Sequence, residues 1–392
     1  MRTRRPLPRL AVLLGVTSFL SDVASEMIYP LLPVLLATSL GAGALAVGWV
    51  EGAAESLAAF LKLLAGWGSD RSRRKKPWVV AGYALAGVAR PLVAFAGSVG
   101  QVLAVRLTDR VGKGLRSAPR DALLAAAVDP ADRGRAFGFH RAADHAGALV
   151  GPLVAAALLA FGWGLETVFL WAFLPGLLAP LVVLFGVRER LVPEAVPAAA
   201  GGLGLAPGEG RALAPYLVTL ALFTLGNSTD AFLLLRAVEL GVPAAAVPLL
   251  WAFLHAVKSG LATWGGGLSD RLGRRRVITC GWGLYGLVYL GLAGATTAWQ
   301  VWGLFALYGL HYALVEGAEK ALVADFVPAA RRGAAFGWYH GVIGLCALPA
   351  SVAFGALWQL AGASVAFTCG ALLAGFATAL LATWVRVPAP RE

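Results

Sequence analysis

The chain has few charged residues for its length. Only 14% of its 392 residues are Asp, Glu, Lys or Arg, whereas about a quarter are charged in an average soluble domain. Apolar residues make up 59% of the chain, and the mean hydropathy is +0.74. A soluble core of this length needs far more polar surface. The composition therefore excludes an ordinary soluble protein and predicts an integral membrane protein.

Cysteine is equally scarce. Cys280, Cys346 and Cys369 all lie in apolar segments, and the sequence has neither a CxxC pair nor a His/Cys cluster. This pattern excludes a disulfide framework and a zinc site, so we expect no metal and no cofactor. The sequence also lacks a GxxxxGK[ST] loop and any recognisable catalytic motif. It therefore does not indicate an ATPase or another enzyme.

Basic residues exceed acidic ones, and the formal net charge is +12. This balance does not indicate nucleic-acid binding, because the Lys and Arg residues form short clusters separated by apolar spans. These clusters are RTRR at the start, DRSRRKK at 70–76, DRGR at 132–135, RER at 188–190, DRLGRRR at 270–276 and RR at 331–332. They fall on alternate loops, as the positive-inside rule requires of cytoplasmic loops. We expect a multi-pass protein of the plasma (inner) membrane, with both termini cytoplasmic.

Twelve apolar segments have the length of about 20 residues that a membrane-spanning helix needs. They lie near 10–37, 44–68, 78–97, 100–127, 136–160, 165–187, 212–238, 245–268, 276–294, 298–325, 333–360 and 364–386. A Pro- and Gly-rich stretch separates the sixth from the seventh. The predicted organisation is a helical domain over 1–190, a cytoplasmic linker over 191–211 and a second helical domain over 212–392.

The two halves of the sequence resemble each other. GWGSDRSRRKK (66–76) matches GGLSDRLGRRR (266–276) at an offset of 200, and RGRAFGFH (133–140) matches RGAAFGWY (332–339) at an offset of 199. The motifs recur in the same order, which favours duplication of a six-helix unit. We therefore predict an all-α membrane protein whose twelve transmembrane helices form two six-helix bundles related by pseudo-twofold symmetry, an arrangement known among transporters.

These motifs resemble those of the major facilitator superfamily. The GWGSDRSRRKK loop is similar to the motif that the superfamily carries between its second and third helices, although Ser72 and Arg73 depart from the pattern. GALVGPLVA (147–155) is similar to a motif of exporters that exchange substrate for protons, and Arg106 stands where such exporters carry an arginine. The resemblance implies a monomeric transporter for a small-molecule substrate and protons in a lipid bilayer, without nucleic acid.

The resemblance also implies roles at the cytoplasmic ends of the helices. It implies that Asp70 binds the N-terminus of the predicted helix 333–360 and stabilises the outward-facing state, and that Asp270 does the same to the helix 136–160. We call this contact the latch. The alternative is that these loops are basic only to set topology. The residues assigned to gating are Asp70, Arg71, Asp270, Arg271, Arg116, Arg120, Gly147, Gly151 and Pro152.

Ionic side chains also occur inside the predicted spans, where an isolated charge costs at least about 2.5–3.5 kcal/mol. We assign proton coupling to Asp22, Glu26 and Asp144, and expect acids of the first and fifth spans to neutralise the basic face of the span 100–127. The alternative is that these acids form fixed salt bridges. Glu316 and Lys320 have the spacing of an ion pair.

Substrate binding is assigned to Arg106, Arg110, Asp109 and Glu55. Arg106 and Arg110 would bind an anionic or carbonyl group, or else serve only as counter-ions. Taken together, the sequence predicts a secondary transporter that works by alternating access and exports a small organic solute or drug in exchange for protons. The first alternative is a symporter or uniporter that imports a polar or anionic solute. A more remote alternative is a membrane sensor or enzyme that does not transport.

Overall fold

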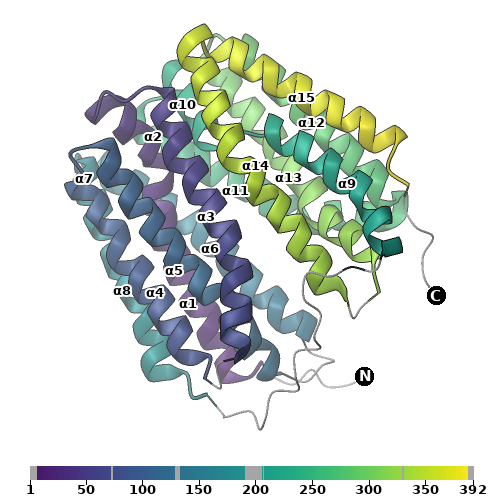
Figure 1. Ribbon diagram of the computed structural model, residues 1–392. Helices are drawn as coiled ribbons and strands as arrows, with labels where there is room; N and C mark the ends of the chain where they lie inside the picture. Colours follow the sequence, from purple (N-terminus) through teal and green to yellow (C-terminus); the bar gives the residue numbers. More distant parts are fainter. Residues whose placement is uncertain are drawn as a thin grey trace. The chain divides into compact units, whose positions relative to one another are not determined.

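The computed structural model describes residues 7–71, 74–128, 133–189, 205, 207–328 and 331–386, apart from the side chains of 62–71, 133, 134 and 207. Every regular element in these ranges is helical (Figure 1). Ten helical segments of the described ranges are long and apolar enough to cross a membrane. The predicted all-α class is confirmed.

Two long helices are not among these ten segments. They are α5 (Val99–Ala126) and α13 (Ala298–Phe326), which coincide with the predicted spans 100–127 and 298–325. At a rise of about 1.5 Å per residue, each extends about 42 Å, which exceeds the roughly 30 Å of the hydrocarbon core. Both helices are therefore long enough to cross, but their ionic side chains require polar partners within the protein.

The chain divides into two compact units. Unit 1 comprises Met1–Leu31 and Phe60–Ala198, and unit 2 comprises Leu32–Ala59 and Ala199–Glu392. The boundary between Ala59 and Phe60 falls within a single helix, α3 (Ala44–Arg71). Of the predicted linker 191–211, residues 191–204 and 206 lie outside the described residues, and its last positions belong to the helix that begins at Pro207.

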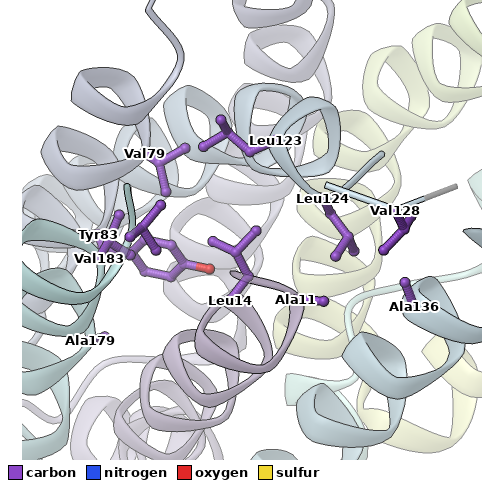
Figure 2. Close-up of a cluster of buried hydrophobic side chains, with 11 residues drawn as sticks. Ala11, Leu14, Val79, Tyr83, Leu123, Leu124, Val128, Ala136, Ala179 and Val183 are labelled. Carbon is purple, nitrogen blue, oxygen red and sulfur yellow. The ribbon is translucent and has the colours of Figure 1, made fainter. Parts of the chain in front are cut away.

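Unit 1 is a helical bundle. Besides α5 and the second part of α3, its elements are α1 (Arg9–Ile28), a 3₁₀ turn (Tyr29–Leu31), α4 (Lys76–Ala89) with a 3₁₀ extension (Arg90–Phe95), α6 (Arg133–Ala160), α7 (Leu165–Trp171), α8 (Phe173–Leu181) and a π-helical turn (Val182–Gly186). Helix α1 packs against α6 and α8, and α4 packs against α5 and α8. Figure 2 shows part of the core, in which the Tyr83 hydroxyl points toward Leu14 of α1.

Two glycines of α6 allow that helix to approach α1 closely. A Cβ atom on Gly147 would lie 2.6 Å from the Phe19 carbonyl oxygen, and one on Gly151 would lie 2.6 Å from the Val23 carbonyl oxygen. Real Cβ atoms do not approach backbone atoms this closely, so a larger residue would push the two helices apart. The glycines therefore fix the distance between α1 and α6 where both helices carry acidic residues.

Unit 2 contains the first part of α3, up to Ala59, and the helices from residue 207 onward, together with the short helical turns between Leu32 and Ser39. These are α2 (Leu32–Val34), a π-helical turn (Leu35–Ser39), α9 (Pro207–Gly226), α10 (Ala231–Glu239), a 3₁₀ turn (Ala244–Ala246), α11 (Val247–Leu272), α12 (Arg274–Gly294), α13, α14 (Arg332–Ala361) and α15 (Ala363–Thr383). Helix α13 packs against α11 and α12, while α9 packs against α14 and α15.

The sequence repeat extends to the positions of helices. Helices α5 and α13 begin at residues 99 and 298, and helices α6 and α14 begin at residues 133 and 332, which is an offset of 199 in both cases. Equivalent helices of the two halves can therefore be compared residue by residue at this offset.

Candidate functional site

Unit 1 holds a buried group of ions on α5 and on the 3₁₀ extension of α4, which we call the Asp109 cluster. Arg90 Nε donates to Asp109 Oδ1 at 2.7 Å. On the other carboxylate oxygen, Asp109 Oδ2, Arg106 Nη1 lies at 3.5 Å and Arg110 Nη1 at 3.8 Å. Asp109 is 1% exposed, and the three arginines are 4–5% exposed. One carboxylate is thus shared by three guanidinium groups.

Small residues bring the partners of this cluster together. A Cβ atom on Gly82 of α4 would lie 2.6 Å from the carbonyl oxygen of Gly112 on α5. The two backbones can therefore approach closely enough for the short Asp109 side chain to reach Arg90. Arg90 Nη1 also donates to the backbone oxygen of Ser21 at 2.8 Å and to its hydroxyl at 3.2 Å, which links the cluster to α1.

The Asp109 cluster gathers several guanidinium groups in one place. Three of them share the Asp109 carboxylate in a buried environment. Buried guanidinium groups need polar partners, and an anionic group of a ligand can be one of them. A small pocket adjoins the cluster and has room for about one water molecule. Its lining residues are Ser25, Ile28, Arg90, Val93, Val105, Arg106 and Asp109.

A second polar group, which we call the Ser18 network, joins α1, α4, α5 and α6. The Ser18 hydroxyl lies 3.0 Å from Tyr83 Oη and 2.7 Å from His140 Nε2, and it accepts a hydrogen bond from Arg120 Nη1 at 3.3 Å. Arg120 Nη2 also lies 2.9 Å from Asp121 Oδ1. One hydroxyl therefore connects side chains from three other helices. Arg120, assigned to gating from the sequence, belongs to this network.

Arg116 lies one turn before Arg120 on α5. It is 3% exposed, and its guanidinium group stacks 4.2 Å from the centre of the Tyr83 ring. Its Nε and Nη1 atoms have no hydrogen-bond partner among the described residues. The ionic groups that act on it include Asp22, Arg90 and Arg120. This buried cation therefore has hydrogen-bonding capacity that the described side chains do not use.

The three acids assigned to proton coupling lie on α1 and α6. Gly147 packs against Asp22, and Gly151 packs against Glu26, so the close approach of the two helices occurs at these acids. Asp144 Oδ2 lies 3.5 Å from His140 Nδ1 and 3.8 Å from Arg141 Nη1, both on its own helix. Asp22 acts electrostatically on Arg116 and Asp144 on Arg120, both of α5, while Asp109 contacts Arg106 and Arg110. Pro152 lies inside α6 and removes one backbone donor there.

Other residues assigned from the sequence belong to α3 or to unit 2. Glu55 belongs to the part of α3 that is grouped with unit 2. Asp270 forms an ion pair with Arg274, which also lies 3.2 Å from Asp325 Oδ2, and Arg271 is exposed. The side chains of Asp70 and Arg71, at the end of α3, lie outside the described residues. Lys320 Nζ lies 3.7 Å from Glu316 Oε1, which confirms the predicted pair.

Unit 2 has a polar centre of its own, where the predicted span 212–238 is interrupted. Helix α9 ends at Gly226 and α10 begins at Ala231. Asp230 lies in this interruption and accepts hydrogen bonds from Tyr308 Oη at 2.6 Å and Tyr312 Oη at 2.9 Å. Lys258 of α11 lies 4.3 Å from the centre of the Tyr312 ring. Interrupted membrane helices commonly line binding sites.

Sequence reasoning missed several of these polar residues. Arg90 is the lone arginine of a predicted span, in the run GVARPLVAF, and this isolation was a usable signal. Ser18 and Tyr83 gave no such signal, because each is common in membrane helices and only the fold brings them together. The interruption before Asp230 was signalled by Asn227, Ser228 and Thr229, a polar run inside an apolar segment.

Comparison with known proteins identifies relatives over almost the whole chain. The family model described as Major Facilitator Superfamily matches residues 14–263 and 240–392. An uncharacterized MFS-type transporter of Methanocaldococcus jannaschii is 36% identical over 381 residues, covering 94% of this chain and 93% of its own. An uncharacterized protein of Mycobacterium tuberculosis is 31% identical over 359 residues, covering 90% of this chain and 87% of its own.

Solved structures with the same fold include known transporters. A POT family transporter in complex with 5-aminolevulinic acid is similar with a TM-score of 0.82 at 12% identity, covering 96% of each chain. The human organic anion transporter MFSD10 is similar with a TM-score of 0.70 at 18% identity, covering 96% of this chain and all of its own (100%). At such low identities, the similarity establishes the fold alone.

Proposed function

Because the chain belongs to the major facilitator superfamily, and is therefore a membrane transporter rather than an enzyme, we propose that it exports a small organic solute in exchange for protons. In this proposal twelve helices, counting α5 and α13, form two pseudo-symmetric bundles of six. The protein is a monomer of the plasma (inner) membrane, both termini and the linker are cytoplasmic, and transport proceeds by alternating access.

The observation that carries the proposal is the Asp109 cluster. Replacing buried ions by apolar residues of similar size is often neutral or stabilising, so stability alone does not explain three buried arginines that share one carboxylate. Ionisable groups inside membrane segments commonly mark the path of a substrate or an ion. A small pocket with room for about one water molecule adjoins the cluster and is lined in part by Arg90, Arg106 and Asp109.

The chemistry of the cluster suggests which part of a solute it binds. Arg106 and Arg110 contact Asp109 at 3.5–3.8 Å, which is longer than a strong charge-assisted hydrogen bond. A carboxylate, phosphate or strongly polarised carbonyl of the solute could replace these long contacts with shorter ones. In the proposed site, Arg106 and Arg110 bind this group and Asp109 holds them in place. Glu55 of α3 contributes a negative charge to solute recognition.

Proton coupling is proposed for Asp22, Glu26 and Asp144. Asp22 and Glu26 lie at the α1–α6 contact, where Gly147 and Gly151 remove all side-chain volume between the helices. A small relative movement of α1 and α6 would therefore change how water and arginines reach these carboxyl groups. An acid that exchanges an arginine partner for apolar surroundings changes its proton affinity. The same movement that reorients the solute site can then bind or release a proton.

Gating is proposed for the cytoplasmic ends and for the bend in α6. The latch assigns Asp70 and Asp270, each followed by an arginine (Arg71 and Arg271), to the cytoplasmic gate. In the structure the Asp270 carboxylate is bound to Arg274, so the latch requires that it change partners. Arg116 and Arg120 contribute to the same gate from α5, and Pro152, with Gly147 and Gly151, allows α6 to bend.

The test is solute-driven proton movement in liposomes. Purified full-length protein is reconstituted with a pH-sensitive dye inside, and solutes of similar size bearing a carboxylate, an ammonium or no charge are added under an imposed gradient. Proton movement opposite to the solute supports the proposal. Asp22→Asn, Glu26→Gln and Asp144→Asn are compared with the exposed control Glu166→Gln. Unchanged proton flux in all three variants would show that the coupling assignment is wrong.

A second candidate function is import of an anionic solute by symport or uniport. It is favoured by the three guanidinium groups that meet at Asp109, because guanidinium groups bind carboxylates and phosphates well. The same liposome assay separates the two functions. In symport, protons enter with the solute; in uniport, carboxylate-bearing solutes move and the dye signal is flat.

A further inference from the structure

Glu319 is a buried carboxyl group that the proposed mechanism does not use. It lies on α13, two turns before the C-terminal end of that helix, and it is 8% exposed. Its Oε1 atom accepts a hydrogen bond from Trp282 Nε1 of α12 at 2.7 Å. Its Oε2 atom accepts one from Tyr339 Oη of α14 at 2.8 Å. Three helices of unit 2 therefore meet at this carboxyl group.

Among the described residues, no Lys, Arg or His nitrogen lies within ion-pair distance of Glu319. The titratable and charged groups around it on the packed helices are Tyr216 of α9, Lys258 of α11, Glu316 and Lys320 of α13 and Tyr339 of α14. Both lysines instead contact Glu316, at 3.3 Å and 3.7 Å. Because a carboxylate buried without a cation is costly, this group has a strong reason to hold a proton.

The two neighbours of Glu319 suit both of its protonation states. The Trp282 indole can only donate, so it serves an oxygen that remains an acceptor whether or not the acid is protonated. The Tyr339 hydroxyl can donate to a carboxylate or accept from a carboxylic acid after rotation of its O–H bond. Glu319 can therefore keep both hydrogen bonds in either protonation state.

The repeat gives an independent indication that this position is special. At the offset of 199, Trp282, Glu319 and Tyr339 correspond to Tyr83, Arg120 and His140, which belong to the Ser18 network. The same three helix positions therefore carry buried polar side chains in both halves. In unit 1 the position on α5 is permanently cationic, whereas in unit 2 its counterpart on α13 is an acid that can gain and lose a proton.

We propose that Glu319 is a proton-binding site of the transporter, which takes up a proton on Oε2 from water and releases it to water during the cycle. This inference rests on the proposed proton coupling and adds a site in unit 2 to the acids of α1 and α6. Tyr339 holds the carboxylate by donating a hydrogen bond and holds the acid by accepting one. Trp282 keeps the carboxyl plane fixed in both states.

Infrared difference spectroscopy of the purified full-length protein tests this site with protons alone. The carbonyl stretch of a protonated carboxylic acid is followed from about pH 4 to about pH 9, which covers ordinary and buried carboxyl groups. Glu319→Gln keeps both hydrogen-bonded neighbours and should lose one titrating band. Glu239→Gln is the matched control, because Glu239 also accepts a hydrogen bond from an indole, that of Trp358, at 3.1 Å. Unlike Glu319, Glu239 forms an ion pair with Arg236, and its side chain is 40% exposed.

A spectrum of Glu319→Gln with the same titrating bands as the unaltered protein would overturn the proposal. Tyr339→Phe is a second variant that tests the same site if Glu319→Gln does not fold. It should keep the band but move its midpoint to higher pH, because the bond lost by the carboxylate is charge-assisted and stronger than the bond lost by the acid. An unmoved midpoint counts against the proposed pair. These outcomes do not depend on any solute, so they stand apart from the liposome test of export.

Coupling at Glu319 is then measured with a solute that the liposome assay has identified. Glu319→Gln should still exchange labelled solute across the membrane at equal concentrations, while solute-driven proton movement falls at least several-fold. Proportional loss of exchange and proton movement would show a structural role for Glu319 and overturn the inference. Unchanged proton movement would overturn it as well.

Discussion

Replacing Asp109 should destabilise the protein more than replacing any one of its arginine partners. Asp109→Asn removes the carboxylate that Arg90, Arg106 and Arg110 share and leaves the three arginines buried without it. Arg90→Gln is milder, because the carboxylate still has two guanidinium groups at 3.5 Å and 3.8 Å. The double variant should be more stable than Asp109→Asn alone, since it removes one of three mutually repelling cations.

The magnitude follows from the cost of leaving a buried charge without its partner, about 3–5 kcal/mol. For a unit of roughly this size, each kcal/mol lowers the melting temperature by about 2–4 °C, so Asp109→Asn should melt about 6–20 °C below the unaltered protein. The control is Glu166→Gln, an exposed acid in the first turn of α7. Removing the charge of Glu166 should lower the free energy of unfolding by at most about 1 kcal/mol, because it removes a favourable interaction with the helix dipole.

The assay is thermal unfolding of each purified variant in the same detergent, followed by tryptophan fluorescence. All variants are heated at one scan rate, because unfolding of membrane proteins is often irreversible. A melting temperature of Asp109→Asn equal to that of Glu166→Gln would refute the reasoning. So would a double variant less stable than Asp109→Asn, because the arginines would then not be repelling one another.

Two further predictions concern packing and hydrogen bonding. Gly151→Ala should abolish transport and lower the melting temperature, because the added Cβ atom meets the Val23 backbone. Gly138→Ala on the same helix places its Cβ atom in open space, so it should be neutral or stabilise the protein by up to about 1 kcal/mol. Ser18→Ala should lower the free energy of unfolding by about 1–3 kcal/mol, because three side chains lose a hydrogen-bond partner. Ser228→Ala should lower it less, because the Ser228 hydroxyl has the single side-chain partner Tyr289 at 2.9 Å. Equal melting temperatures within either pair would contradict the corresponding prediction.

The helices could be predicted because apolar length is a local property of the sequence. The predicted span 298–325 corresponds to α13 at Ala298–Phe326, and 44–68 corresponds to α3 at Ala44–Arg71. Hydropathy could not reveal that the segment 212–238 divides into α9 and α10, since four polar or turn residues hardly change its average. Hydropathy also did not show the 3₁₀ turn that contains Pro30 or the π-helical turn at Leu35–Ser39.

The candidate site was only half predictable. Periodicity placed Arg106, Asp109 and Arg110 on one face of a helix, and all three are buried together. It could not name the principal partner of Asp109, because Arg90 approaches from another helix through a contact set by Gly82 and Gly112. Charge alone favoured the acids of α1 and α6 as the neutralising groups. Which acid contacts which arginine depends on how each helix is rotated about its own axis. That rotation is set by packing between helices, so the sequence of one helix does not reveal it.

The repeat shows how one helical framework has acquired two different interiors. At the offset of 199, Arg90 and Asp109 correspond to Tyr289 and Tyr308, so the ion pair of unit 1 is replaced by tyrosines in unit 2. Tyr289 and Tyr308 both lie beside Tyr285 in the buried aromatic core of that unit. Stacked rings gain dispersion energy without the desolvation cost that buried ions incur. If stability alone selected these positions, both halves would favour the aromatic solution. Packing stability alone therefore does not explain the ions of unit 1.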